Sequence, residues 1–251
     1  MYDIEETDIS FRELSLICEE CKKKKVPICI IGGWATFFYV NENFRRAFGR
    51  DYMSSRDIDM FFPPEKEKEF AEIVFGLGFV KDGLQFRYEK NYHRELRKFV
   101  SEQESKKTEI FNLIKIFLDL FSNKPTRELS SWNDLEPLKT LSIELINGFP
   151  VADINTLAEL KGIALFARDK ADKEHKDACD LYSLLQYSGR RINSSVCIKK
   201  AVEKLINRSE LINSIAHHVL TDIGKRSIVE VTLRNNLASL EKQGYYQSHD
   251  T

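Results

Sequence analysis

Two acidic residues, Asp57 and Asp59, lie two positions apart in a run that is otherwise apolar and continues through Ile58 and Met60–Phe62. The β-branched and aromatic residues of this run predict a strand. Residues two apart on a strand point to the same face, with Cα atoms about 6.5 to 7 Å apart. Two carboxylates placed in this way can hold divalent cations, which activate an attacking oxygen and neutralise a leaving pyrophosphate. Alone, the pair is a weak signal, because many such pairs are solvated loop residues.

A glycine turn precedes the two acids. The short run Pro27–Ile31 predicts a strand, Gly32 and Gly33 a turn, and Trp34–Val40 a helix. Glycines at such a turn let the backbone approach a phosphate, and the N–H groups at the start of the helix can bind it. A plain tight turn is the alternative. Ser55 can hydrogen-bond a phosphate or simply cap the entrance of the second strand.

The apolar pattern also predicts the elements that position these residues. Helices are expected at Phe11–Lys24 and Glu65–Leu77, with a polar, basic connection at Asn41–Ser54. Residues 79–150 are expected to form mainly strands and turns, with strands at Phe79–Val80, Gln85–Tyr88 and Leu113–Phe121 and a loop at Ser101–Lys107. A further pair of strands is expected at Leu138–Leu145 and Phe149–Ile154, around a turn at Asn147-Gly148.

From Thr156 the pattern changes to helices, expected at Leu157–Ala167, Lys176–Tyr187, Val196–Ile206 and in a last segment that ends near Leu240. The sequence therefore predicts an α+β fold. We expect an α/β core at residues 1–155 and a helical C-terminal part at residues 156–251.

Composition narrows the classes of function. The 251 residues carry 38 basic and 39 acidic side chains, so a nucleic acid would need a local basic face. Five cysteines without a regular framework, and no N-terminal signal peptide, indicate a reducing cytoplasm and no disulfide. Cys18 and Cys21 form a CxxC on an apolar helix stripe and are expected to be core residues. No apolar run reaches the roughly 18 to 20 residues that span a bilayer.

Three blocks of the chain together resemble the nucleotidyltransferase superfamily that includes DNA polymerase beta. The chain is more closely similar to the abortive-infection AbiEii-type toxins and related minimal nucleotidyltransferases. The first block joins Ile31–Ala35 to Ser55–Asp59, the second is Leu157–Arg168, and the third is Lys176–Leu181. The blocks follow the family's order and cover roughly residues 28 to 187.

The resemblance implies a mixed-sheet nucleotidyltransferase domain whose nucleotide cleft is completed by the helical C-terminal part. It implies an enzyme that moves a nucleoside monophosphate from a nucleoside triphosphate to an acceptor hydroxyl. Mg²⁺, with Mn²⁺ as an alternative, would be held by Asp57, Asp59 and a third carboxylate, for which Asp119 is the first choice and Asp153 the reserve. The implied nucleotide-binding residues are Gly32, Gly33, Ser55, Lys161, Arg168, Lys176, Asp177 and Asp180.

The residues of the two later blocks also have ordinary interpretations. Lys161 and Arg168 share a helix face and can both reach a triphosphate, or they can form a solvated basic stripe. Lys176 and Asp180 are spaced as an i,i+4 ion pair, which is common on helix surfaces. Asp177 or Asp180 can also position Lys161 electrostatically.

The acceptor stays open, because the resemblance allows a tRNA 3′ end, a protein or a small molecule. A toxin role with an antitoxin partner is implied by the resemblance alone. One rival is a small-molecule nucleotidyltransferase of the aminoglycoside-modifying kind, and another is a non-catalytic nucleotide-binding regulator with the same fold. The basic residues that can form an RNA-facing surface on the C-terminal helices are Lys199, Lys200, Lys204, Arg208, Lys225, Arg226 and Arg234.

Overall fold

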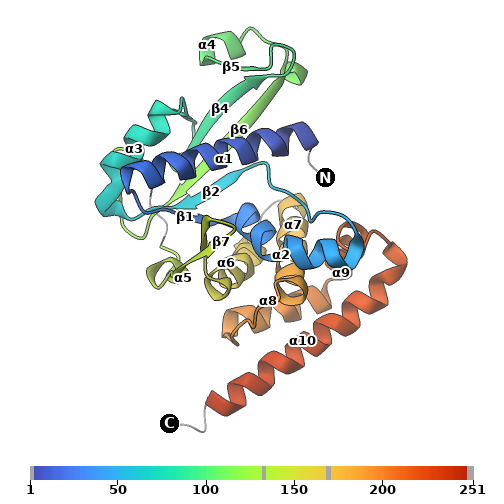
Figure 1. Cartoon of the computed structure of the whole chain (residues 1–251). Coiled ribbons are helices and arrows are strands. Elements are labelled where there is room, and N and C mark those ends of the chain that lie inside the picture. The colour runs from blue at the N-terminus through green and yellow to red at the C-terminus, as the bar shows by residue number, and fades with distance from the viewer. Residues whose placement is uncertain (1–2, 132–133, 168–170, 248–251) are drawn as a thin grey trace. The chain divides into compact units, whose positions relative to one another are not determined.

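The computed structural model describes residues 3–131, 134–167 and 171–247 (Figure 1). The chain divides into two compact units, Met1–Ala35 with Met53–Ala152 and Thr36–Tyr52 with Asp153–Thr251. The first unit contains a mixed β-sheet, and the second is helical. These features confirm the α+β fold class expected from the sequence. The domain boundary at residue 155 stays a prediction.

The described part of the first unit holds one sheet of eight strands. They are β1 (Cys29–Ile31), β2 (Ile58–Phe61), β3 (Val80–Lys81), β4 (Arg87–His93), β5 (Lys98–Val100), β6 (Leu113–Phe121), β7 (Ile143–Ile146) and β8 (Phe149–Ala152). Their order is β3-β4-β6-β2-β1-β8-β7, and β5 pairs with β4. The β2–β6 and β1–β8 pairs are parallel, whereas β1–β2 and β4–β6 are antiparallel. The sheet is therefore mixed, as expected.

One face of this sheet is apolar and packs on helix α1 (Ile4–Lys24), beside which lies α3 (Glu67–Gly76) (Figure 1). Ile58, Met60 and Leu118 of the central strands are fully buried. Lys90 of β4 donates to Glu13 of α1 over 2.7 Å, which marks this face of β4 as the one toward the helix. Because side chains alternate along a strand, the neighbours of these residues point to the opposite face.

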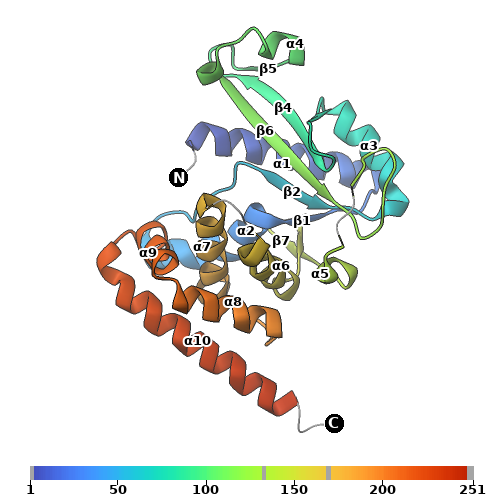
Figure 2. The same cartoon turned by 180° about the vertical axis from the view of Figure 1, so that it is seen from behind.

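The second unit is a bundle of helices (Figure 2). Helix α2 (Gly32–Phe48) begins in the first unit and continues in the second. The others are α6 (Ile154–Ala167), α7 (Ala171–Tyr187), α8 (Val196–Asn207), α9 (Ser209–His218) and α10 (Arg226–Gln247). Helix α6 packs on α7 and α8, and α10 packs on α8 and α9. Apolar stripes that include Leu205, Ile215 and Leu233 form the fully buried centre of this bundle.

Short helical segments complete the described structure. They are α4 (Glu102–Ser105), α5 (Glu136–Lys139), η1 (Pro64–Lys66), η2 (Ile110–Asn112) and η3 (Ile223–Lys225). No described helix is both long and apolar enough to cross a membrane. All five cysteines are free thiols. Burial raises the pKa of both Cys18 and Cys21 to about 12, which agrees with their expected place in the apolar stripe of α1.

Several expected elements were wrong in extent or type. Helix α2 continues to Phe48 where a polar connection was expected, because Phe44 is fully buried and extends the apolar stripe one turn past Val40. Helix α9 was not expected. The expected loop at Ser101–Lys107 contains α4, which is closed by a capping box between Ser101 and Glu104.

The strands after residue 79 also differ in their ends. Strand β4 runs on to His93 through a charged stretch, because Glu89 pairs with Lys115 over 2.9 Å on the neighbouring strand. The strand expected from Leu138 begins only at Ile143, since the segment before it contains α5. The hairpin at Asn147-Gly148 is confirmed, with positive φ angles of 52° and 85° that suit a tight two-residue turn.

Candidate functional site

Three charged residues form one row across the middle of the sheet. Asp59 of β2 lies opposite Asp119 of β6, and Asp119 lies opposite Arg87 of β4. All three point to the face away from α1, because they alternate with residues that face the helix. Strand pairing thus brings together two of the carboxylates that the sequence singled out. It also places a guanidinium beside them.

Arg87 and Asp119 form a bidentate ion pair. Arg87 donates from Nε to Asp119 Oδ1 over 2.7 Å and from Nη2 to Oδ2 over 2.6 Å. The two side chains are only 16% and 9% exposed, and the guanidinium lies 4.7 Å from the centre of the Phe117 ring. Hydrogen bonding to Asp119 raises the pKa of Arg87, and the negative charges of Asp57 and Asp59 add to this effect. Arg87 is therefore a fixed positive charge that binds Asp119 and acts electrostatically on Asp57 and Asp59.

Asp57 lies just before β2 and has a guanidinium of its own nearby. Arg56 Nε is 3.3 Å from Asp57 Oδ1, and the Arg56 guanidinium lies 5.8 Å from the centre of the Phe117 ring. Ser55 is 4% exposed and donates its hydroxyl to the carbonyl oxygen of Asp57 over 2.9 Å. The sequence left two roles open for Ser55, phosphate binding and capping of the strand entrance. In the structure its hydroxyl closes the turn that leads into β2. Its contact with a phosphate stays a prediction.

The side chain of Asp59 packs against the backbone of Gly32. The φ of Gly32 is +69°, and a Cβ at this position would lie 2.0 Å from Asp59 Oδ2 and 2.8 Å from Asp59 Cβ. The Asp59 side chain therefore packs directly against the first residue of α2, where the helix dipole favours negative charge. Gly33 follows as a buried residue of the same helix. The glycine turn thus positions a carboxylate, and its contact with a phosphate stays a prediction.

Replacing Gly32 by Ala is expected to lower the free energy of unfolding by about 2 to 5 kcal/mol, because a strained φ and a clash with Asp59 add together. Gly49 is the matched control, since its φ is +67° and nothing lies within 4 Å of an added Cβ. Gly49→Ala should cost only the strain, about 1 to 2 kcal/mol. Urea unfolding followed by circular dichroism measures both. Equal losses would show that Asp59 does not pack on Gly32.

A buried lysine cluster lies in the second unit. Lys161 of α6 is 7% exposed and donates to Asp177 Oδ1 over 3.0 Å and to Asp180 Oδ2 over 2.6 Å. Lys176 donates to the same Asp180 oxygen over 3.2 Å. Tyr52 donates its hydroxyl to Asp180 Oδ1 over 2.9 Å. The two lysines and two aspartates that the sequence singled out are therefore part of one hydrogen-bonded group.

Burial and charge act in opposite directions on this cluster. Burial alone would lower the pKa of Lys161, but the charges of Asp180 and Asp177 outweigh it and raise the pKa. Burial alone would raise the pKa of Asp180, but Lys161 and Lys176 outweigh it and lower the pKa. Burial raises the pKa of Tyr52 well above its ordinary value, so its hydroxyl stays protonated. At neutral pH Lys161 and Asp180 are therefore both charged and paired with each other.

Two candidate residues of the sequence remain, Asp153 and Arg168. Asp153, the reserve carboxylate, lies at the start of α6, where its Oδ1 accepts from the backbone N–H groups of Asn155 and Thr156, each over 3.1 Å. Arg168 lies outside the described residues. Within the described ranges, no group of three or more His, Cys, Asp or Glu residues is arranged to hold a metal ion.

Arg87, Arg56, Phe117 and Tyr52 belong to these two groups and were not anticipated. Arg87 stands 32 residues before Asp119 in the chain, so only the pairing of β4 with β6 brings the two together. Tyr52 lies in the segment expected to be a polar connection. An aromatic residue in that segment was the only signal the sequence offered for it.

Several basic residues of the C-terminal helices are ion-paired within the second unit. Lys204 lies 2.7 Å and Arg208 3.4 Å from Glu174 of α7. Arg234 lies 2.8 Å from Glu230 on its own helix. Because these three side chains have acidic neighbours, they contribute less positive charge to an RNA-facing surface.

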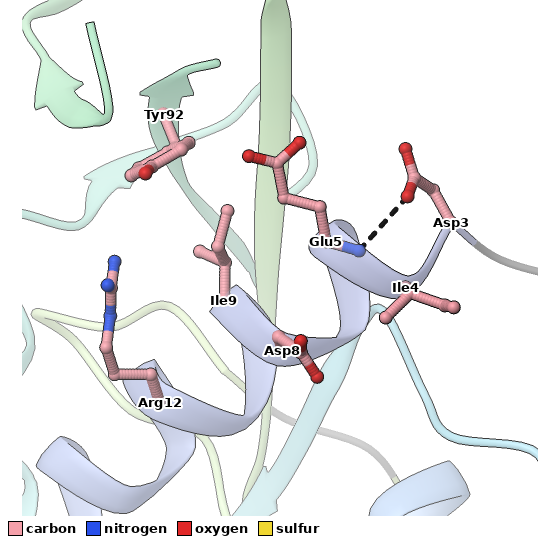
Figure 3. Close-up of a pocket in the computed structure, with 7 residues that line it drawn as sticks. All are labelled: Asp3, Ile4, Glu5, Asp8, Ile9, Arg12 and Tyr92. Carbon is pink, nitrogen blue, oxygen red and sulfur yellow. Dashed lines mark hydrogen bonds between the residues drawn. The ribbon is translucent and has the colours of Figure 1, made fainter. Parts of the chain in front are cut away.

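A pocket of about 590 Å³ lies beside the first turns of α1 (Figure 3). Two of its carboxylates already have a cation, since Arg94 Nη1 lies 2.7 Å from Asp3 and 2.6 Å from Glu5. Tyr92 lines the pocket and stands five residues after Arg87 on β4, so it faces the opposite side of the sheet. The pocket is therefore separate from the sheet face that carries Asp59, Asp119 and Arg87, which we call the carboxylate face.

Comparison with known proteins supports the fold. No family model matches the sequence, and no curated protein matches it. The crystal structure of JHP933 from Helicobacter pylori is similar with a TM-score of 0.55 and 14% identity, covering 99% of each chain. This likeness shows a shared fold over nearly the whole length.

Two further structures are similar at lower scores. An antigenic nucleotidyltransferase-like protein from Paracoccidioides brasiliensis has a TM-score of 0.47 and 16% identity, covering 83% of this chain and 92% of its own. The antibiotic-resistance factor ANT(2'')-Ia has a TM-score of 0.39 and 16% identity, covering 94% and 99%. TM-scores below 0.5 do not establish a common fold.

Proposed function

We propose that this protein is a nucleotidyltransferase that moves a nucleoside monophosphate from a nucleoside triphosphate to an acceptor hydroxyl. The observation that carries the proposal is the carboxylate face of the sheet. Asp57 and Asp59 stand at the start of a central strand, and Asp59 packs on Gly32 at the start of α2. The order of three sequence blocks, which resembles that of the nucleotidyltransferases, supports the same reaction.

In this reaction the acceptor oxygen forms a bond with the α-phosphorus, while the bond from that phosphorus to the bridging oxygen of the β-phosphate breaks. Pyrophosphate leaves, and a carboxylate of the site takes up the hydroxyl proton. Asp57 and Asp59 offer the anionic oxygen ligands that Mg²⁺ prefers, so they fit such a cation. When bound, Mg²⁺ would supply charge neutralisation on the phosphates.

The buried cluster of the second unit has a supporting role in the proposal. Asp177 and Asp180 hold Lys161 charged and in place. Lys176 is the more accessible of the two lysines, with a side chain that is 22% exposed. We assign these lysines to neutralising the triphosphate, in line with the resemblance.

The finer parts of the proposal concern the acceptor. Following the resemblance to AbiEii-type toxins, we propose the 3′ end of a tRNA as the acceptor, with a protein hydroxyl as the alternative. A toxin role would add an antitoxin protein as a partner.

The experiment is to incubate the purified protein with each α-labelled nucleoside triphosphate and Mg²⁺, separately with total RNA, with a protein mixture and with an aminoglycoside. Label in RNA is the expected result. Label on protein would overturn the RNA acceptor, and label on the aminoglycoside would favour the small-molecule reaction. A protein that transfers no label and binds no Mg-nucleotide would contradict the proposed enzyme and favour a non-catalytic role.

A further inference from the structure

Arg87 lies beside the carboxylates that are proposed to bind cations, so it affects how many cations can bind there. The inference rests on the proposed function. We propose that Arg87 takes the place of one of two divalent cations. In this arrangement Asp57 and Asp59 hold a single cation. Asp119, the expected third ligand, instead stays bound to Arg87.

The first support is that both oxygens of Asp119 are already used. Nε and Nη2 of Arg87 bind Oδ1 and Oδ2 over 2.7 and 2.6 Å, which is the full bidentate geometry of an arginine–carboxylate pair. A cation on Asp119 would have to replace at least one of these hydrogen bonds. The planar guanidinium is matched to a carboxylate in a way that a lysine is not.

The second support is that Arg87 is held by its surroundings. It lies directly opposite Asp119 in the β4–β6 ladder, and its guanidinium packs 4.7 Å from the centre of the Phe117 ring. Its side chain is 16% exposed. If a cation displaced Arg87, the guanidinium would be left without its carboxylate in a largely buried position, which is unfavourable.

The third support is the balance of charge. Arg87 and Asp119 cancel each other, and the Arg56 guanidinium, 3.3 Å from Asp57, offsets part of the charge of Asp57 and Asp59. At most two negative charges therefore remain, which match no more than one divalent cation. A second divalent cation would compete with the nearby positive charge of Arg87.

The experiment is to count Mn²⁺ ions bound to the nucleotide-free protein by electron paramagnetic resonance, so that every bound ion lies on protein ligands. Wild-type protein is expected to bind one Mn²⁺ per chain. Arg87→Met frees Asp119 and is expected to bind two. The double variant Arg87→Met/Asp119→Asn removes both members of the ion pair without changing the net charge, and it is expected to bind one, with an affinity within about threefold of wild type. Arg45→Met is the control, because it removes an arginine from an ion pair with Asp51 elsewhere and should leave the count at one.

The outcomes separate this inference from the proposed function. Two ions in the wild type, a loss of the ion in the double variant, or a single ion in folded Arg87→Met would each overturn the inference and leave the reaction standing. No ion in the wild type would contradict the metal-dependent reaction itself. Circular dichroism establishes that each variant is folded, and the double variant decides the question if Arg87→Met does not fold.

Discussion

Asp59→Asn is expected to lower the rate of nucleotide transfer by about a thousandfold or more, because the loss of a metal carboxylate removes several kcal/mol of transition-state stabilisation. The substitution keeps the size and shape of the side chain that packs on Gly32, so the fold should be retained. The rate of label transfer from an α-labelled nucleoside triphosphate measures the effect. Circular dichroism establishes that the variant is folded.

The matched control for this prediction is Asp134→Asn. Asp134 is exposed and forms a surface ion pair with Lys139 over 3.0 Å. Such pairs contribute little, so this variant should transfer nucleotide at the wild-type rate. Folded Asp59→Asn protein with a rate within tenfold of wild type would show that Asp59 does not hold a catalytic cation.

Lys161→Met is expected to lower the free energy of unfolding by about 3 to 5 kcal/mol, because it removes the cation that donates to both buried carboxylates. Asp177 and Asp180 are 3% and 0% exposed, so water cannot replace the lysine. Lys176→Met is the control, since this lysine is partly exposed and Lys161 remains. Lys176→Met should lower the free energy of unfolding by about 1 kcal/mol or less. Urea unfolding at pH 7 gives both values, and equal costs would contradict the central position of Lys161.

The same cluster predicts how stability depends on pH. The folded pKa of Asp180 is lower than its ordinary value of 3.8, so its contribution is present above that pH and is lost as the pH falls through the folded value. The folded pKa of Lys161 is raised above 10.5, so its contribution is complete below that pH and is lost only in strong alkali. The cluster should therefore stabilise the fold at a constant level from about pH 5 to pH 9. Asp180→Asn should lose less stability than wild type when the pH falls from 5 to 3.

Much of the fold could be predicted because its signals are local. The strand that carries Asp59 follows from its apolar neighbours and the prolines after it, and the hairpin follows from Asn147-Gly148. The extent of α2 was wrong because a polar segment with Arg45 and Arg46 also carries Phe44, whose burial depends on tertiary packing. Local pattern decides the type of an element more firmly than it decides the ends.

The candidate site was predictable where it depends on spacing along one element. The strand position of Asp59 follows from its apolar neighbours, and the pair of Lys176 and Asp180 needs only one turn of helix. Asp57, which was expected on the same strand, lies in the bend just before β2. The pairing of Arg87 with Asp119 depends on which strands are neighbours, and the sequence does not contain strand order in any local form. The packing of Asp59 against Gly32 also depends on the β1–β2 pairing.

The carboxylate face is proposed to support transfer of a nucleoside monophosphate. The most direct measurement compares two forms of the same nucleoside triphosphate, labelled at the α- or the γ-phosphate, incubated with the wild-type protein, Mg²⁺ and total RNA. We expect α-label to appear in the RNA and γ-label to appear in released pyrophosphate, with both products formed about a thousandfold more slowly, or not at all, by Asp59→Asn. Transfer of the γ-label to the acceptor, or equal α-label transfer by Asp59→Asn, would contradict the account.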